Sequence, residues 1–156
     1  MANADLRRNK DARFYEKKTV SVMAARVSST LYGARATSDI LTLFDVPENS
    51  FITGVTLNRN SAGTTGAQLD VQVGGTLNTA KDGFTGGVQA FDDADLGTAG
   101  IAASSNTPIN ANTGATVRVQ FGGTAAASYD FTLSVEFVEH TLGNNTLVET
   151  PPEPEF

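Results

Sequence analysis

Cysteine and tryptophan are absent from the 156 residues of this chain, and histidine occurs once. Without cysteine, neither a disulfide framework nor a thiolate metal site can form. A single histidine nearly excludes a histidine-centred catalytic triad or a histidine-rich metal cluster. We therefore expect no cofactor, no metal centre and no enzymatic activity, although a catalytic pair of carboxylates has no recognisable spacing in a sequence.

Long apolar runs are missing as well. No stretch approaches the ~20 apolar residues that a membrane span needs. The first ten residues, MANADLRRNK, lack the apolar core of a signal peptide. We expect a soluble protein that is made in a cytoplasm and does not enter a membrane.

Charged residues are few and unevenly placed. They make up 18% of the chain, against about 25% in typical globular domains. Residues 1–35 hold eight basic and three acidic residues, whereas residues 36–156 hold three basic and fourteen acidic ones. A segment of net charge +5 therefore precedes a body of net charge −11. The acidic body disfavours nucleic acid as a partner, because phosphate binding needs a positive surface.

Apolar residues recur at every second position in four stretches, which begin at Val20, Leu69, Val117 and Phe131. Such alternation predicts strands with one buried side and one side in water. Residues 40–46 and 51–58 are apolar on both parities, which is typical of strands that are central or covered on both faces.

Turn residues separate these stretches. Residues 47–50 and 61–66 have turn or loop chemistry, and glycine pairs occur at 74–75, 86–87 and 122–123. Residues 76–113 are irregular, so we expect one or two short strands with long loops there. No stretch has a convincing helical period. Short strands at close spacing with such turns predict an all-β sandwich or barrel.

Three parts follow from this pattern. Residues 1–18 form a basic N-terminal arm, residues 19–142 a single antiparallel β domain, and residues 143–156 an acidic, proline-rich tail. The prolines exclude the tail from a sheet interior, because they lack the backbone donor.

The arm holds the candidate contact residues. Its basic side chains could touch phosphates, could be solvated, or could dock on an acidic protein surface with two aromatic residues as anchors. Acidic residues within the arm weaken the nucleic-acid interpretation, so we favour docking. The candidate contacts to another subunit are Arg7, Arg8, Lys10, Arg13, Phe14, Tyr15, Lys17 and Lys18.

Two other features could carry chemistry. Asp92, Asp93 and Asp95 form a carboxylate cluster of the kind that Ca²⁺ favours. Their spacing is not that of an EF-hand, so a solvated loop is the simpler interpretation and cation binding stays open. The lone His140 lacks partners for nucleophilic catalysis, and we interpret it as a surface or hydrogen-bonded structural residue.

Four segments carry a family resemblance: residues 40–57 (ILTLFDVPENSFITGVTL), 66–74 (GAQLDVQVG), 115–123 (ATVRVQFGG) and 129–138 (YDFTLSVEFV). Their order resembles that of small structural proteins of tailed bacteriophages, the capsid decoration or cement type, over residues 38–139. The resemblance implies a jelly-roll-like antiparallel β-sandwich, often a trimer. It also implies a place on the outside of the mature capsid, where major capsid protein subunits meet.

The expected function is therefore that of a structural virion protein, made in the host cytoplasm, which stabilises the shell. Its expected partners are the major capsid protein and further copies of itself, with a trimer favoured over a dimer. The alternative is a β-sandwich module on a phage head or tail that binds host-surface carbohydrate or a receptor. Sugar sites usually use exposed aromatics, and this chain has no tryptophan and three tyrosines.

Overall fold

The structure is a computed structural model that describes the backbone of residues 15–78 and 83–142 and the side chains of residues 20–78 and 83–140. Over these ranges the chain forms eleven strands and one short helix. In chain order they are β1 (Tyr15–Ser28), α1 (Ser29–Tyr32), β2 (Ile40–Val46), β3 (Ser50–Ser61), β4 (Ala67–Val73), β5 (Thr76–Asn78), β6 (Gly83–Thr85), β7 (Val88–Asp95), β8 (Gly100–Ala103), β9 (Ile109–Ala111), β10 (Ala115–Gly123) and β11 (Asp130–Leu142). No helix in the described ranges is long and apolar enough to cross a lipid bilayer.

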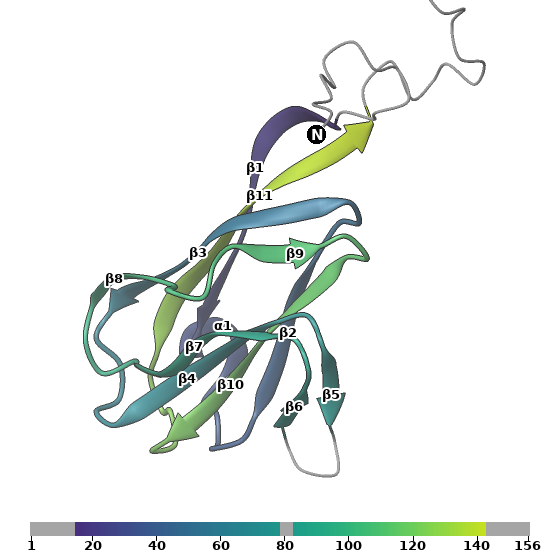
Figure 1. Ribbon diagram of the computed structural model, residues 1–156. Helices are drawn as coiled ribbons and strands as arrows, with labels where there is room; N and C mark the ends of the chain where they lie inside the picture. The colour runs from purple at the N-terminus through teal and green to yellow at the C-terminus, as the bar shows by residue number, and fades with distance from the viewer. Residues whose placement is uncertain (1–14, 79–82, 143–156) are drawn as a thin grey trace, which may run out of the picture.

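Two antiparallel sheets form the body of the protein (Figure 1). We call them sheet I, with the order β1-β11-β3-β8 and β9 also on β3, and sheet II, with the order β2-β10-β4-β7. The hairpin β5–β6 is inserted between β4 and β7. The chain passes repeatedly between the sheets, and their strand orders are those of a jelly roll. The predicted fold class, an all-β antiparallel sandwich of jelly-roll type, is confirmed.

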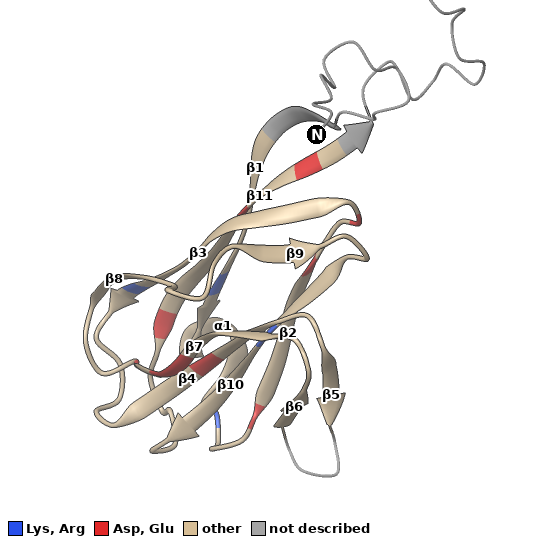
Figure 2. Ribbon diagram, in the orientation of Figure 1, with Lys and Arg blue, Asp and Glu red and all other residues tan. Residues whose placement is uncertain are grey.

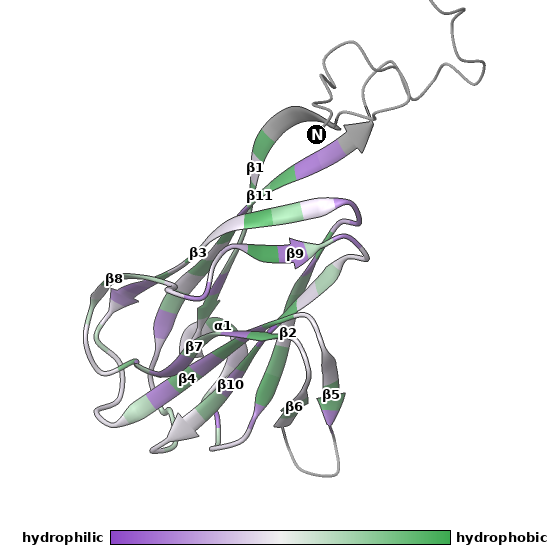
Figure 3. Cartoon of the chain, in the orientation of Figure 1, coloured by the Kyte–Doolittle hydropathy of each residue, from purple (hydrophilic) through white to green (hydrophobic). Residues whose placement is uncertain are grey.

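The core lies between the sheets and follows the predicted alternation in three of the four stretches. The buried positions are Leu69, Val71 and Val73 in β4, Val117, Val119 and Phe121 in β10, and Phe131, Leu133, Val135 and Phe137 in β11. Hydrophobic and hydrophilic residues alternate along β4 (Figure 3). Because successive side chains of a strand point to opposite faces, one parity of each strand builds the core.

In the fourth stretch, which lies in β1, the side of the strand that carries Val20 and Val22 faces solvent and the other side faces the core. Val20 and Val22 are 47% and 60% exposed, whereas Met23 packs on the core and Val27 is buried. Both parities of β1 carry apolar residues, so local alternation could not decide which side faces inward. The pairing with β11 decides it, because Val27 lies opposite the buried Phe131.

Residues 76–113 contain more strand than the sequence predicts. Five short strands, β5 to β9, occupy this range instead of one or two. Strands β7, β8 and β9 owe their place to distant partners, since β7 pairs with β4 while β8 and β9 pair with β3. The two stretches with apolar residues on both parities also differ from each other: β3 is central in sheet I, but β2 is at an edge of sheet II.

Two predicted glycine turns meet at the base of the β5–β6 hairpin. Gly75 and Gly87 have φ values of 71° and 75°, a region that side chains other than glycine rarely adopt. A β-carbon at Gly75 would lie 2.6 Å from the backbone of Gly86, and one at Gly87 would lie 2.7 Å from the backbone of Gly74. A side chain at either position would therefore strain the backbone and push the two turns apart.

The two chain ends leave the sandwich from the same place. Tyr15 pairs with Leu142 at the outer end of the β1–β11 ribbon (Figure 1). Strand β1 thus includes the last four residues of the predicted arm. The rest of that arm, residues 1–14, and the predicted tail, residues 143–156, lie outside the described residues.

Candidate functional site

Most of the predicted contact residues cannot be placed. Arg7, Arg8, Lys10, Arg13 and Phe14 lie outside the described residues. The backbone of Tyr15 and Lys17 pairs with β11, and Lys18 lies at the shift in register that follows Lys17. Docking through the arm therefore stays a prediction.

The predicted carboxylate cluster has a different membership in the structure. Asp92 and Asp93 lie in strand β7 and not in a loop, and they meet Asp70 of the neighbouring strand β4. One carboxylate oxygen from each of these three residues lies within 4.8 Å of the others, and the red bands of β4 and β7 lie side by side in Figure 2. Carboxylates at this spacing could hold a hard divalent cation.

Asp95 does not belong to this cluster. Its carboxylate accepts hydrogen bonds from the Gly97 amide at 2.8 Å and from the Thr98 hydroxyl at 3.1 Å. It therefore fixes the turn between β7 and β8. The sequence gives no sign of Asp70, because the β5–β6 hairpin separates β4 from β7 along the chain and the two strands are brought together only by pairing within the sheet.

The environment of Asp70 is unfavourable for its charge. Partial burial raises the pKa of its carboxyl, and the nearby charges of Asp93 and Asp92 raise it further. The Asp93 amide donates a 2.7 Å hydrogen bond to Asp70 and lowers the pKa in part. We call Asp70, Asp92 and Asp93 the acidic patch, which lies on the outer face of sheet II.

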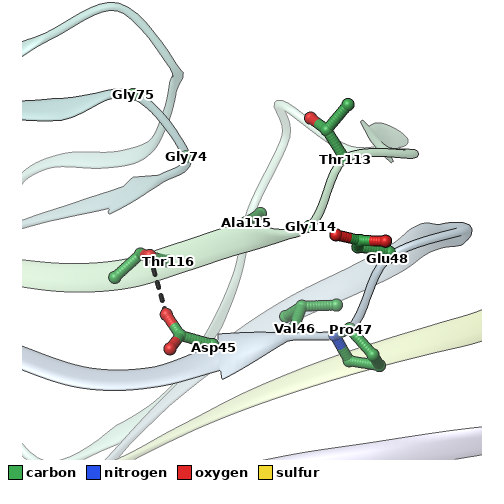
Figure 4. A pocket seen from close by; sticks show the side chains of 10 residues that line it. All are labelled: Asp45, Val46, Pro47, Glu48, Gly74, Gly75, Thr113, Gly114, Ala115 and Thr116. Carbon is green, nitrogen blue, oxygen red and sulfur yellow. Dashed lines mark hydrogen bonds between the residues drawn. The ribbon is translucent and has the colours of Figure 1, made fainter.

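A cleft of about 520 Å³ lies at one end of sheet II (Figure 4). It is bounded by the β2–β3 turn, the Gly74–Gly75 turn and the start of β10. Asp45 and Glu48 are its charged lining residues, and Asp45 accepts a 2.7 Å hydrogen bond from the Thr116 hydroxyl. The lining has no basic group that would bind an anion and no aromatic ring on which a sugar could stack.

The outer face of sheet I has a different character. Val20 of β1, Val138 of β11 and Phe51 of β3 lie side by side in register across three strands. Val138 is 5% exposed because its neighbours cover it, whereas Val20 and Phe51 remain open to solvent. His140 packs edge-on to Phe51, with ring centroids 6.3 Å apart. We call Val20, Val22, Phe51 and Val138 the apolar patch.

Charges on this face of sheet I are few, and two of them neutralise each other. Arg26 donates hydrogen bonds of 3.1 and 2.8 Å to the two carboxylate oxygens of Asp130. The Arg26 guanidinium and the Asn60 amide hold the pKa of Asp130 below its ordinary value. Sheet II thus carries an acidic outer face, while sheet I offers an apolar patch that borders the exposed Glu136, which lies opposite Val22, and the closed Arg26–Asp130 ion pair lies farther along β1. Depletion of charge is a mark of interface cores.

Comparison with known proteins shows which solved structures share this architecture. No family model matches the chain, and no curated protein matches it either. Among solved structures, it is similar to a chain of the capsid of cyanophage Pam1, with a TM-score of 0.56 and 18% identity over 79% of this chain and 86% of the other. The capsid of the Helicobacter pylori bacteriophage KHP30 holds another similar chain, with a TM-score of 0.57 and 11% identity over 84% and 96%.

The protein has the fold of a bacteriophage capsid chain. The capsid of Ralstonia phage GP4 adds a similar chain with a TM-score of 0.50 and 23% identity over 78% and 86% of the two chains. The resemblance to phage capsid proteins drawn from the sequence is therefore confirmed at the level of the fold. A chain of the VP2 subviral particle of infectious bursal disease virus is also similar, with a TM-score of 0.50 and 16% identity over 80% of this chain, but the match covers only 34% of that longer chain.

These neighbours are chains of capsid structures, and at 11% to 23% identity the likeness shows a shared fold. The described surface presents two sheet faces, an acidic patch and a cleft. Two features of this surface were not predicted from the sequence: the place of Asp70 in the acidic patch, and the exposure of Val20 and Val22. The sequence contains one indication that Val20 and Val22 could be exposed, which is that apolar residues occupy both parities of β1.

Proposed function

We propose that this protein is a decoration protein of a tailed bacteriophage, bound to the outside of the mature capsid where major capsid protein subunits meet. The observation that carries the proposal is the fold shared with chains of three phage capsids. The match spans 86% to 96% of those chains. They are therefore small proteins of about one sandwich each, unlike the longer VP2 chain.

The proposed action is physical. A protein that binds the mature lattice and not the immature one stabilises the mature lattice by mass action. Several copies joined together would bind neighbouring sites with a raised effective concentration. The resemblance favours a trimer, or else a dimer, as the assembled form. The basic arm would contact an acidic surface of the shell, and no catalytic step is involved.

The first test asks whether the protein is part of the virus particle and on which side of the shell it lies. Particles of the virus that encodes the protein are purified and their proteins identified by mass spectrometry. Intact particles are then treated with protease, which reaches external proteins and not internal ones. We expect the protein to co-purify in a fixed ratio to the major capsid protein and to be digested first. A protein absent from particles, or one protected until the shell opens, would contradict the proposal.

The same preparation tests the alternative function. A receptor- or carbohydrate-binding module would show reproducible binding to a host glycan or host surface, which a glycan array measures. We expect no such binding, because the cleft at the end of sheet II has no aromatic lining residue and the second cleft, beside Asp70, has a single one, Phe84.

A further inference from the structure

The acidic patch owes its geometry to an irregularity in the pairing of β4 with β7. The register between the two strands shifts around Asp70, so that this one residue faces both Asp92 and Asp93. In a regular strand, successive side chains would point to opposite faces, but a bulge turns a side chain away from that alternation. One carboxylate oxygen of each aspartate therefore lies within 4.8 Å of the other two.

The negative charges of the patch are not balanced by a basic residue in the part of the chain that the structure describes. The neighbouring charges that act on Asp70 are those of Asp93 and Asp92, and both are negative. The Arg26–Asp130 ion pair lies on sheet I and not on this face. Carboxylates so close together repel one another unless a cation neutralises them.

A second, independent feature lies beside the patch. Asp70 is part of the wall of a cleft of about 420 Å³, which Gln72, Gln89 and Phe84 also line. Gln72 is 3% exposed, and its amide nitrogen donates a hydrogen bond to the Gly86 carbonyl oxygen. Its Oε1 atom is buried and has no hydrogen-bond partner among the described residues. Since buried acceptors are nearly always paired, this oxygen indicates a ligand that is a cation or carries a hydrogen-bond donor.

Gln72 and the patch belong to one continuous site. Gln72 follows Asp70 by two residues in β4, so both side chains leave the outer face of sheet II. Gln89 lies opposite Gln72 in β7, and its amide donates a 3.3 Å hydrogen bond to the Asp92 carboxylate. The cleft thus presents oxygen atoms of two glutamine amides beside three carboxylates, with no basic group in its lining.

Protection of a sheet edge does not explain this arrangement. Edge strands often carry charges that prevent pairing with another chain, and β7 is an edge strand. That role accounts for Asp92 and Asp93 taken alone. It does not account for Asp70 on the interior strand β4, or for the unpaired oxygen of Gln72.

We propose that Asp70, Asp92 and Asp93 bind one Ca²⁺ ion, and that a water molecule on the ion donates a hydrogen bond to Gln72 Oε1. Ca²⁺ takes about six to eight oxygen ligands at about 2.3–2.6 Å, so ligands on opposite sides of the ion lie up to about 5 Å apart. The spacing of the three carboxylates fits this span. Mg²⁺ needs a shorter, near-ideal octahedron and usually takes one or two carboxylates, so it should bind more weakly.

NMR titration of the full-length protein, freed of metal with EDTA and then exchanged into buffer of constant ionic strength, tests the site. We expect the amide shifts on adding CaCl₂ to be largest at residues 70, 92 and 93. They should saturate with a dissociation constant of about 1 mM or less. Asp92→Asn and Asp93→Asn should each raise this constant at least about tenfold, and MgCl₂ should bind at least about tenfold more weakly than CaCl₂.

Asp95→Asn is the matched control, because it removes the same charge from the same strand outside the patch. Its side-chain oxygen can still accept hydrogen bonds from Gly97 and Thr98. We expect it to change the dissociation constant by less than about threefold, since a screened surface charge acts weakly. An equal loss in Asp95→Asn and Asp92→Asn, or shifts that do not saturate, would overturn the proposal.

Thermal unfolding provides a second readout with a variant that keeps its fold. Wild type should melt about 3 °C higher in about 10 mM Ca²⁺ than in EDTA. Asp70→Asn should be at least as stable as wild type in EDTA and gain no stability from Ca²⁺. An equal rise in both proteins would contradict the site. Since no capsid is present, neither experiment bears on the proposed decoration function.

Discussion

The hydroxyl of Tyr129 donates a 2.7 Å hydrogen bond to the carbonyl oxygen of Gly33, 96 residues away in the chain. Tyr129 is 3% exposed, and its ring lies 4.9 Å from that of Phe121 between centroids. The bond thus ties the end of α1 to the start of β11 from inside the core. It satisfies a polar group that burial would otherwise penalise.

Replacing Tyr129 by Phe should therefore lower the free energy of unfolding by about 1–2 kcal/mol. The variant keeps the ring in the core but removes the donor to Gly33, and a lost partner of a partly buried carbonyl costs this much. Tyr32→Phe is the control, because Tyr32 is exposed on α1 and surface changes stay within about 0.5 kcal/mol. Denaturant midpoints compare the two, and equal losses would contradict the role of the bond.

Gly75→Ala should destabilise the protein by more than Gly122→Ala. A β-carbon at Gly75 would clash with the backbone of Gly86, at a positive φ, whereas one at Gly122 meets no atom within 4 Å. Strain of this kind costs on the order of 1–3 kcal/mol. Thermal unfolding of the two variants measures the difference. Similar melting temperatures would show that the two glycine turns need not close on each other.

Asp70→Asn should change the pH dependence of stability. Burial raises the pKa of Asp70 above its unfolded value, so the native state holds this proton more tightly than the unfolded state does. The native state therefore loses stability as pH rises from the unfolded pKa, ~3.9, through the folded pKa. The Asn variant has no such loss of stability, and its side-chain oxygen can still accept the hydrogen bond from the Asp93 amide. We expect it to match wild type near pH 3 and to exceed it at pH 7 by up to about 0.5 kcal/mol.

Asp130→Asn should show the opposite sign. Arg26 and Asn60 lower the pKa of Asp130, so its contribution to stability is present above the unfolded pKa and is lost as pH falls through the folded pKa. The variant should be less stable than wild type at pH 7, with the gap closing in acid. Urea unfolding at several pH values tests both aspartates. Parallel pH curves for wild type and either variant would refute the corresponding pKa shift.

The basic arm can be tested without cutting into the sandwich. A change of Arg7, Arg8, Lys10 and Arg13 to Gln removes four charges and leaves β1 intact, whereas deletion to residue 18 would remove the pairs that Tyr15 and Lys17 make. If the arm docks on an acidic surface, the Gln variant should bind capsids about tenfold more weakly at low salt and respond less to added salt. A variant with Lys in place of the three arginines keeps the charge and should bind like wild type.

Some of this structure could be predicted from local pattern and some could not. The strands around Leu69, Val117 and Phe131 were predictable, because strict alternation needs only the next few residues. The side of β1 that faces the core was not predictable, because Val20, Met23 and Val27 place apolar residues on both sides of the strand. The pairing with β11 determines which side is buried. For the same reason β8 and β9 were missed.

The acidic patch also could not be predicted in full, because local sequence does not show which strands pair. Asp92 and Asp93 are obvious in the sequence, but Asp70 lies more than twenty residues earlier. It joins them because β4 and β7 pair around the inserted hairpin. The resemblance to phage capsid proteins, which rested on the order of strands, is borne out by the shared fold.

We propose that this protein attaches to the outside of a mature phage shell and stabilises it. The most direct measurement is the temperature at which purified capsids that lack the protein release their DNA, with and without added full-length protein. We expect saturable binding to mature capsids, weaker binding to unexpanded ones, and a release temperature that rises with occupancy. Equal binding to both forms of the shell, or an unchanged release temperature at full occupancy, would contradict it.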